Sequence, residues 1–577
     1  MAGLPQFDYI FAIATIFAFL DAWNIGANDV ANSFATSVAS RSLTLKQAMC
    51  IASVMEFAGA MLVGARVTDT IRTKVISTSL FESDPSVLML AMTCAIVGSA
   101  TYLTIATKFT MPVSTTHSLM GGVIGVGIAS AGSEGVNWSF KGVSQVFAAW
   151  GIAPGISGVF AAIIFLITKH GVMRRNNPVK KAFIMVPIYF FLTAFLLALL
   201  IVWKGGSAKI KLSDSAAAGV SLGVGAAVAL IIATFFIPFL HRKIMLEDWE
   251  LRGWEVIKGP LLLRRPTPPP RPEGVKGIPD FYEGHLTAEE LEIKRVNEAQ
   301  AAHVAQDDVE KSTATSVNPK GDGADSDISP LPSVAPRSAQ PLLSKTKKTA
   351  PPGPFFSPAV AWFWLKYALL HGVEQEVVDQ AHRKDFLSGD IEKVHATGEH
   401  FDNRAEYTYS FLQIMTASTT SFAHGANDVS NAIGPYTTIY FIWSTANISN
   451  KVPVPLWILA FGGAGIVVGL WTYGYNIMRA LGNKLTLHSP SRGFSMELGA
   501  AITIIMATKL ALPVSTTQCI CGATVGVGLC NGTWRSINWR MVAWIYMGWF
   551  ITLPCAGIIS GCLMGIILNA PRWGMGI

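Results

Sequence analysis

Charged side chains are scarce in this chain. Of its 577 residues, 14% are Asp, Glu, Lys or Arg and 51% are hydrophobic, whereas about a quarter of the residues in a soluble globular domain are charged. This deficit excludes an ordinary soluble domain and indicates an integral membrane protein. The net charge of +7 is then expected to mark cytoplasmic loops rather than a nucleic-acid-binding surface. We therefore expect no nucleic acid among the partners.

Signatures of enzymes and of metal centres are also missing. The sequence contains no Walker loop, zinc motif or nucleophile elbow. Its seven cysteines lie mostly within apolar runs and lack the spacing of zinc sites or extracellular disulfides; the close pair Cys519 and Cys521 fits apolar packing better than metal binding. We expect no enzyme activity, no transition metal and no cofactor. The N-terminus lacks a basic region and a cleavage site, so the first apolar run is expected to remain as a helix.

Two motifs occur twice. Gly-Ala-Asn-Asp-Val-x-Asn spans 26–32 and returns at 425–431, while Pro-Val-Ser-Thr-Thr spans 112–116 and returns at 513–517. The two offsets, 399 and 401 residues, are nearly equal. Residues 1–168 and 405–577 are therefore predicted to be one transmembrane unit used twice.

Windows of about 20 apolar residues are long enough to span a bilayer. Twelve hydrophobic segments are predicted, near 7–25, 43–65, 86–107, 113–133, 143–168, 182–203, 216–240, 408–424, 456–478, 495–512, 513–531 and 540–569. The sixth and seventh, within 169–240, have no counterpart in the second unit and are predicted to be two additional helices. The proline of each Pro-Val-Ser-Thr-Thr motif sits between two apolar stretches, which is typical of a broken helix or a re-entrant hairpin.

The polar stretch 241–404 is predicted to be a cytoplasmic loop, disordered in its Ser/Asp/Pro-rich part at 306–354. Two helices are expected around that part. One, at 287–302, begins with the capping-box residues Thr287 and Glu290. The other, at 359–380, is aromatic at its start and of a kind that can lie on a membrane surface.

The basic residues predict the orientation. The loops after the fifth and seventh segments are both rich in Lys and Arg, and two crossings separate them, so they share a side. Placing that side in the cytoplasm makes both termini extracellular. Because seven crossings precede the long loop, the second unit starts on the opposite side from the first. The predicted fold is an all-α polytopic membrane protein with two inverted-topology repeats of about five segments each, as in secondary transporters.

Pro-Val-Ser-Thr-Thr fits the start of a helix. Ser and Thr are good N-caps, and the free amide groups at the positive end of the helix dipole attract anions. The hydroxyls could instead only cap the helix or bond to its carbonyls, but duplication of all five residues favours a site for a tetrahedral oxyanion. The candidate ligands are Ser114, Thr115, Thr116, Ser515, Thr516 and Thr517.

The Gly-Ala-Asn-Asp-Val-x-Asn motif offers side-chain oxygens at the end of an apolar run. Such hard oxygen ligands suit a small hard cation, and a carboxylate there is costly to desolvate unless something is bound. A simple turn is the alternative, which two copies at equivalent positions make less favourable. The candidate cation ligands are Asn28, Asp29, Asn32, Asn427, Asp428 and Asn431. Gly26 and Gly425 are expected to permit local unwinding.

At these duplicated motifs the sequence resembles the inorganic phosphate transporter (PiT) family of sodium-phosphate symporters, which includes fungal repressible phosphate permeases. The resemblance covers both hydrophobic blocks and the long loop. It implies phosphate transport with sodium as the coupling ion, essential roles for Asp29 and Asp428, and contact of both Ser-Thr-Thr runs with phosphate. We also place the two aspartates beside the substrate, because phosphate at neutral pH carries a hydroxyl that can donate to a carboxylate.

Further polar residues lie in apolar context. Glu56 and Glu497 are assigned to ion or proton coupling, since intramembrane carboxylates are functional by default. His117 could handle protons, although a packing or hydrogen-bonding role is favoured. Lys108 and Lys509 could draw phosphate inward or could extend to the membrane interface.

Several alternatives stay open. The nearest is a proton-coupled phosphate symporter of the same fold, and a more distant one is a passive anion channel. The sequence is compatible with a homodimer and with regulatory partners of the 241–404 loop. We expect the protein in the plasma membrane.

Overall fold

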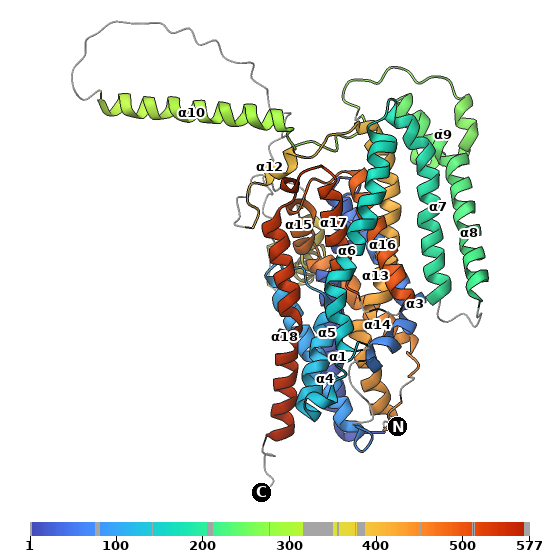
Figure 1. Cartoon of the computed structure of the whole chain (residues 1–577), viewed down its shortest axis with the longest axis vertical. Helices are drawn as coiled ribbons and strands as arrows, with labels where there is room; N and C mark the ends of the chain where they lie inside the picture. The colour runs from blue at the N-terminus through green and yellow to red at the C-terminus, as the bar shows by residue number, and fades with distance from the viewer. Residues whose placement is uncertain are drawn as a thin grey trace.

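The computed structural model describes residues 3–570, except for 30, 75–80, 141, 205–211, 276, 315–349, 353, 355–356, 376, 378–386, 450–451, 511 and 513. Within this part the chain is helical and contains no strand. Figure 1 shows a long bundle with α10 and α12, which belong to the polar stretch 241–404, at one end; we call this end the polar region.

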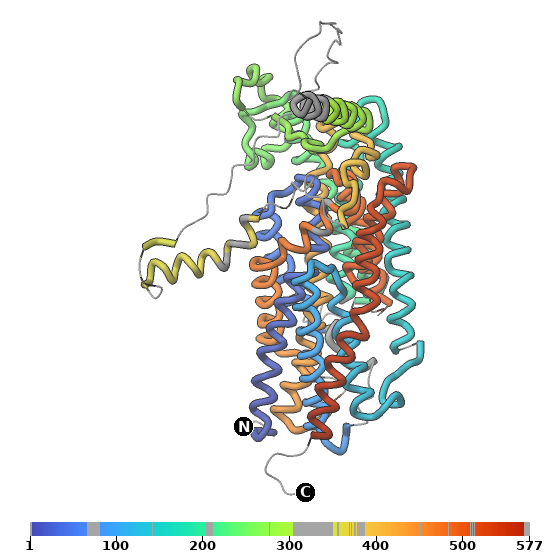
Figure 2. The backbone as a smooth tube through the Cα atoms, turned by 90° about the vertical axis from the view of Figure 1, so that its left-hand side faces the viewer, coloured from blue at the N-terminus to red at the C-terminus, as the bar shows by residue number. Residues whose placement is uncertain are grey.

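The helices of the first unit are α1 (Asp8–Asn28), α2 (Ala31–Ala39), α3 (Leu45–Lys74), α4 (Pro85–Lys108), α5 (Thr115–Ala131) and α6 (Val143–Thr168). The additional helices are α7 (Pro178–Lys204), α8 (Asp214–Ile231) and α9 (Ile237–Leu240). The stretch 241–404 contains α10 (Ala288–Ala314), α11 (Pro358–Leu370) and α12 (Ile391–Ala396), of which α11 projects from the side of the bundle (Figure 2). The second unit contains α13 (Asn403–Thr445), α14 (Leu456–Tyr473), α15 (Tyr475–Lys484), α16 (Pro490–Lys509), α17 (Thr516–Leu529) and α18 (Trp539–Asn569).

In the described part of the chain, eight helical stretches are long and apolar enough to cross a membrane. The predicted segments outside this set correspond to α5, α13, α16 and α17. Two of them are short, with 17 residues in α5 and 14 in α17, whereas a full crossing needs about 20. The other two, α13 and α16, are rich in buried polar residues. These four helices therefore depart from simple spans because they carry the polar interior of the bundle.

The two ends of the bundle differ. Both termini lie at one end, while α10 and α12 lie at the other (Figures 1 and 2). Since α1 starts at the first end and α13 at the second, these helices run in opposite directions. In Figure 1 the short helix α5 lies in the half near the termini and α17 in the half near the polar region. The two short helices thus lie in opposite halves of the bundle, and the inverted repeat stays a prediction.

Glycines bring helices of the two units into direct backbone contact. A Cβ added to Gly26 of α1 would lie 1.9 Å from the carbonyl oxygen of Ile466 in α14, and one added to Gly425 of α13 would lie 2.2 Å from that of Glu56 in α3. The pairs α5·α18 and α6·α17 are equally close, at Gly125 against Gly557 and at Gly526 against Gly158. Small residues permit such approach in membrane helices, so each of these contacts joins one unit to the other.

The additional helices α7 and α8 stand side by side at the periphery (Figure 1). The predicted capping box is confirmed: Glu290 Oε2 accepts from the Thr287 amide at 2.9 Å, and Thr287 Oγ1 accepts from the Glu290 amide at 3.3 Å. The helix that follows, α10, continues to Ala314, beyond the predicted end at 302. In contrast, α11 ends at Leu370 and is shorter than predicted. Most of the stretch predicted to be disordered lies outside the described residues.

Candidate functional site

The two Ser-Thr-Thr runs open helices, as predicted. Ser114 is the N-cap of α5 and accepts from the His117 amide at 3.3 Å. Ser515 is the N-cap of α17 and accepts from the Gln518 amide at 3.4 Å. Because the first amide groups of a helix have no intrahelical acceptor, both starts can donate to a ligand. Ser114 and Ser515 thus cap their helices, which is the alternative role that the sequence analysis left open.

The duplicated aspartates meet at these helix starts. Asp29 accepts from Thr115 Oγ1 at 2.7 Å and from Thr517 Oγ1 at 3.1 Å, while Asp428 accepts from Thr516 Oγ1 at 3.0 Å. Both carboxylates are buried, with 1% of each residue exposed. Ligand atoms of Asp29, Asp428 and His424 lie within 4.8 Å of one another. The structure therefore brings the two units together at one buried polar centre.

The last asparagine of each motif crosses to the other unit. Asn32 Nδ2 donates to Thr517 Oγ1 at 2.7 Å, and Asn431 Nδ2 donates to Thr116 Oγ1 at 3.0 Å. Among the described residues, Oδ1 of each asparagine is buried and has no hydrogen-bond partner. An unpaired buried acceptor is costly, so these two oxygens are available for a cation or for a ligand hydroxyl.

The first asparagines behave differently. Asn28 uses both ends of its amide to hold the connection between α4 and α5, since it donates to Thr107 Oγ1 and the Met111 carbonyl and accepts from the Val113 amide. Asn427 Nδ2 donates to its neighbour Asp428 at 2.8 Å. The predicted cation ligands Asn28 and Asn427 thus have structural partners in this conformation.

The expectation that Gly26 and Gly425 unwind the chain is wrong. Both glycines lie inside helices, α1 and α13, and α13 stays helical through the whole motif. Their lack of a side chain serves the close helix contacts instead, because a Cβ at either position would overlap the facing backbone. In the first unit the helix is interrupted only after Asn28, between α1 and α2.

Comparison with known proteins identifies the family. The model of the phosphate transporter family (PHO4) matches residues 25–560. The chain belongs to this family. It is 58% identical to the phosphate-repressible phosphate permease pho-4 of Neurospora crassa over 99% of both chains, and 27% identical to human sodium-dependent phosphate transporter 1 over 92% of both. These are transporters and permeases, which confirms that the protein is not an enzyme.

A solved structure has the same fold. A protein described as the sodium-dependent phosphate transporter aligns with a TM-score of 0.64 over 98% of this chain and 100% of its own, at 24% sequence identity. The all-helical transporter fold predicted for this family member is therefore confirmed.

His424 is a site residue that the sequence prediction missed. It lies in α13, four residues before Asp428, and is fully buried. Its Nδ1 is 2.7 Å from Glu56 Oε2, which also places Glu56 at the centre. Its Nε2 is 2.9 Å from Asp428 Oδ2, an ion-pair distance when the ring is protonated. Ser421 Oγ donates to the other Glu56 oxygen at 2.8 Å. The signal was present, since His424 directly precedes the second motif.

Glu497 has a separate environment. Its Oε1 accepts from Thr36, Ser37 and Gln413, and its Oε2 accepts from Thr416 at 2.6 Å. Four donors satisfy this buried carboxylate without a cation. Glu497 therefore does not share the centre with Asp29 and Asp428 in this conformation, although Thr36 lies one turn beyond Asn32.

The remaining candidates lie away from the polar centre or lack polar contacts. The His117 ring is buried beside Trp150, 5.7 Å between ring centroids, with no hydrogen-bond partner among the described residues. This favours the packing role. Lys509 pairs with Asp214 at 2.7 Å and lies over the Trp203 ring, and Lys108 is exposed. Both lysines thus face the periphery.

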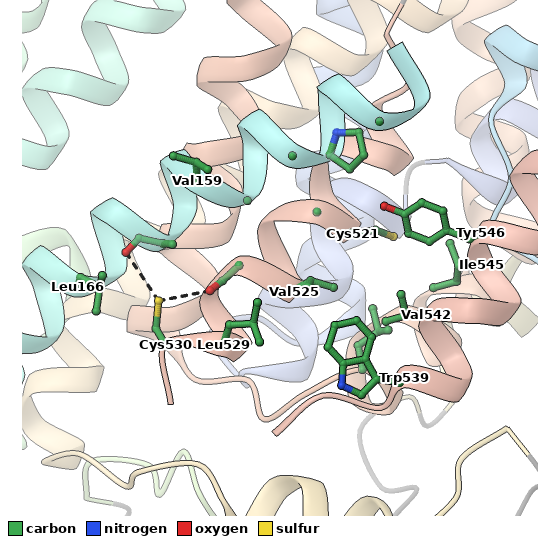
Figure 3. A pocket seen from close by; sticks show the side chains of 18 of the residues that line it. Val159, Leu166, Cys521, Val525, Leu529, Cys530, Trp539, Val542, Ile545 and Tyr546 are labelled. Carbon is green, nitrogen blue, oxygen red and sulfur yellow. Dashed lines mark hydrogen bonds between the residues drawn. The ribbon is translucent and has the colours of Figure 1, made fainter. Parts of the chain in front are cut away.

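A separate cavity of about 820 Å³ lies between α6, α17 and α18 (Figure 3). Its walls are mostly apolar, with Val159, Leu166 and Leu529 among them. At its edge the Cys530 thiol donates hydrogen bonds to two backbone carbonyls, those of Ala162 and Gly526. None of the duplicated aspartates or threonines lines it. The polar centre, which is more compact, is therefore the candidate transport site.

Proposed function

We propose that this protein imports inorganic phosphate across the membrane together with sodium. The observation that carries the proposal is the pair of unbonded oxygens, Oδ1 of Asn32 and Oδ1 of Asn431, beside two buried aspartates at two helix N-termini. The names of its relatives, a phosphate-repressible phosphate permease and sodium-dependent phosphate transporters, agree with this substrate and ion.

The helix starts supply the anion contacts. Free amides of α5 and α17 and the hydroxyls of the two Ser-Thr-Thr runs can donate to phosphate oxygens, and both helix dipoles favour negative charge there. The threonine hydroxyls now bound to Asp29 and Asp428 would have to turn toward the substrate. Phosphate can in return donate its own hydroxyl to an aspartate, so the site offers both kinds of partner.

A bound sodium ion would offset the repulsion between negative charges at the site. Two carboxylates within 4.8 Å of each other, joined by an anionic substrate, would repel one another in a buried place unless cations separate them. Carboxylate and amide oxygens are the hard ligands that such a cation prefers. Asp29, Asp428, Asn32 and Asn431 are the residues proposed to hold it. Glu56 and Glu497 are proposed to assist coupling, Glu56 through His424.

Phosphate uptake into proteoliposomes tests the proposal. At fixed pH, uptake should require an inward sodium gradient and should accumulate phosphate above its external concentration. Uptake that follows a proton gradient without sodium would favour the proton-coupled alternative, and transport that never exceeds equilibrium would favour a channel. Asp29→Asn and Asp428→Asn should each abolish uptake, while Asp214→Asn, which alters only an exposed ion pair, should not.

The orientation is also a proposal. From the basic loops we propose that the 241–404 region lies in the cytoplasm and both termini outside, in the plasma membrane. A tag inserted near Gly321 should bind antibody only after cells are permeabilised. Labelling of intact cells would reverse the orientation.

A further inference from the structure

A second buried carboxylate lies outside the proposed transport site. Asp21 is in α1, two turns before Asn28, and 0% of it is exposed. Eight residues separate it from Asp29, or about 12 Å along a helix axis. Neither oxygen of its carboxylate has a hydrogen-bond partner among the described residues.

The neighbouring hydroxyls cannot satisfy this carboxylate as they stand. The Ser99 side chain of α4 lies against Asp21, but its hydroxyl donates to Ser118 Oγ of α5 at 3.1 Å. Ser118 can in turn donate to the Ser99 carbonyl at 3.3 Å. While Ser99 donates to Ser118, its hydroxyl proton is not available to Asp21.

A proton resolves this contact with the groups already present. A protonated Asp21 would donate to Ser99 Oγ, and the chain of donors would then run from Asp21 to Ser99, to Ser118 and to the Ser99 carbonyl. A proton needs one acceptor, the Ser99 hydroxyl, whereas sodium would need several oxygen ligands. Ionised and empty, the carboxylate would be a buried charge without compensation.

We propose that Asp21 is a proton-binding site, formed with Ser99 and Ser118, whose proton is released only when the contact between α1 and α4 opens. The site makes transport depend on pH apart from any ion held at Asp29 and Asp428. The proposal relies on the proposed function only for its uptake measurement.

Few other charges bear on Asp21. Asp29, which directly follows α1, is the acidic neighbour that acts on it. The neighbouring helices contribute Lys108 and Tyr102 of α4, His117 of α5, His424 with Asp428 of α13, and Arg479 with Lys484 of α15, while α14 carries no Asp, Glu, His, Lys or Arg. Tyr102 is bonded to Thr552 instead. No basic side chain among these is recorded in contact with Asp21, so no recorded positive charge balances an ionised Asp21.

Further along α1, Asn24 makes the next polar contact with α4. Its Nδ2 donates to the Ala100 carbonyl at 3.1 Å and to Thr104 Oγ1 at 3.0 Å. Asn28 follows with Thr107. Polar contacts between α1 and α4 thus lead from Asp21 toward the transport site. A change in the protonation of Asp21 can therefore alter the packing of α1 and α4 at that site.

Infrared spectroscopy of the purified full-length protein tests the proton directly. The carbonyl stretch of a protonated buried carboxyl group should be present at neutral pH and should be lost in Asp21→Asn. In Ser99→Ala, which keeps Asp21 but removes its acceptor, the band should persist at a shifted frequency. Spectra of wild type and Asp21→Asn that coincide in this region would overturn the proposal. This readout involves no transport, so it stands even if phosphate import is refuted.

Uptake shows the functional consequence. The ratio of Asp21→Asn uptake to wild-type uptake cancels the ionisation of phosphate itself. This ratio should be constant at acidic pH and should change toward alkaline pH, by at most about tenfold per unit of pH, the limit for one titrating group. A ratio that is constant from acidic to alkaline pH would overturn the proposal. So would a lower sodium affinity of Asp21→Asn at every pH, because Asp21 would then hold sodium.

Discussion

The contact between His424 and Glu56 is the interaction whose removal gives the sharpest energetic prediction. Both side chains are fully buried, and Glu56 has only Ser421 as a second recorded partner. His424→Ala would leave a carboxylate in the interior with one hydroxyl donor. Loss of one partner of a buried charged pair costs about 3–5 kcal/mol. We expect a reduction of this size in the free energy of unfolding.

Neutralising the carboxylate should recover part of that loss. Glu56→Gln alone should cost about 1–3 kcal/mol, the range for a buried hydrogen-bonding group left with a poorer partner. In the double variant no uncompensated Glu56 charge remains. Its destabilisation should therefore be smaller than the sum of the two single losses by at least about 1 kcal/mol, within the range seen for residues in contact.

A matched control is available in His117. This histidine is equally buried but has no hydrogen-bond partner in the described part of the chain. His117→Ala and Glu56→Gln should be additive within about 0.5 kcal/mol. The measurement is reversible unfolding of the purified protein in mixed detergent micelles. Additivity of His424→Ala with Glu56→Gln would refute the argument that the pair shares a charge.

Three further predictions concern selectivity, packing and pH. Arsenate should compete with phosphate uptake and an equal concentration of sulfate should not, because sulfate has no hydroxyl to donate to Asp29 or Asp428. A lost hydrogen bond to a buried charge is worth about 1.5–3 kcal/mol. Equal inhibition by both anions would place these aspartates away from the substrate. Gly26→Val should lower stability by about 1–3 kcal/mol or more, since its Cβ would lie 1.9 Å from the Ile466 carbonyl oxygen, whereas Gly219→Val, with nothing within 4 Å, should be nearly neutral in detergent melting experiments. Burial opposes ionisation of Glu399, but hydrogen bonds from Arg174 and the charge of Lys169 outweigh it and lower the pKa of Glu399 below its ordinary 4.5. That contact should stabilise the fold by no more than about 1 kcal/mol above the unfolded pKa and lose this effect as pH falls through the folded pKa. Arg174→Gln should reduce this dependence, leaving the part that is due to Lys169. An unchanged stability profile would contradict the assignment.

Local features were predictable from the sequence. The helix starts at Ser114 and Ser515 and the capping box at Thr287 depend on residues within a few positions of one another, so short motifs suffice to recognise them. Duplication also identified Asp29 and Asp428 as partners in one site. Both inferences needed no knowledge of how distant helices pack.

Contacts between distant helices were not predictable in the same way. The bond from Asn32 to Thr517 and the position of His424 beside Glu56 depend on packing between residues hundreds of positions apart. Gly26 was expected to permit unwinding of the helix because glycine is flexible. Its lack of a side chain instead allows the backbone of α14 to approach closely. Asp21 lies outside the duplicated motifs, so duplication gives no signal for it.

The glycine contacts between the two units limit how the protein can move. In each of the four pairs, α1·α14, α3·α13, α5·α18 and α6·α17, one helix comes from each unit and the backbones touch. Separating the units as two rigid halves would break all four contacts at once. Alternating exposure of the site to the two sides of the membrane should therefore use mixed blocks that keep these pairs intact, such as α5 moving with α18 against α6 moving with α17. The division between the two units in the sequence is then not the division between the parts that move.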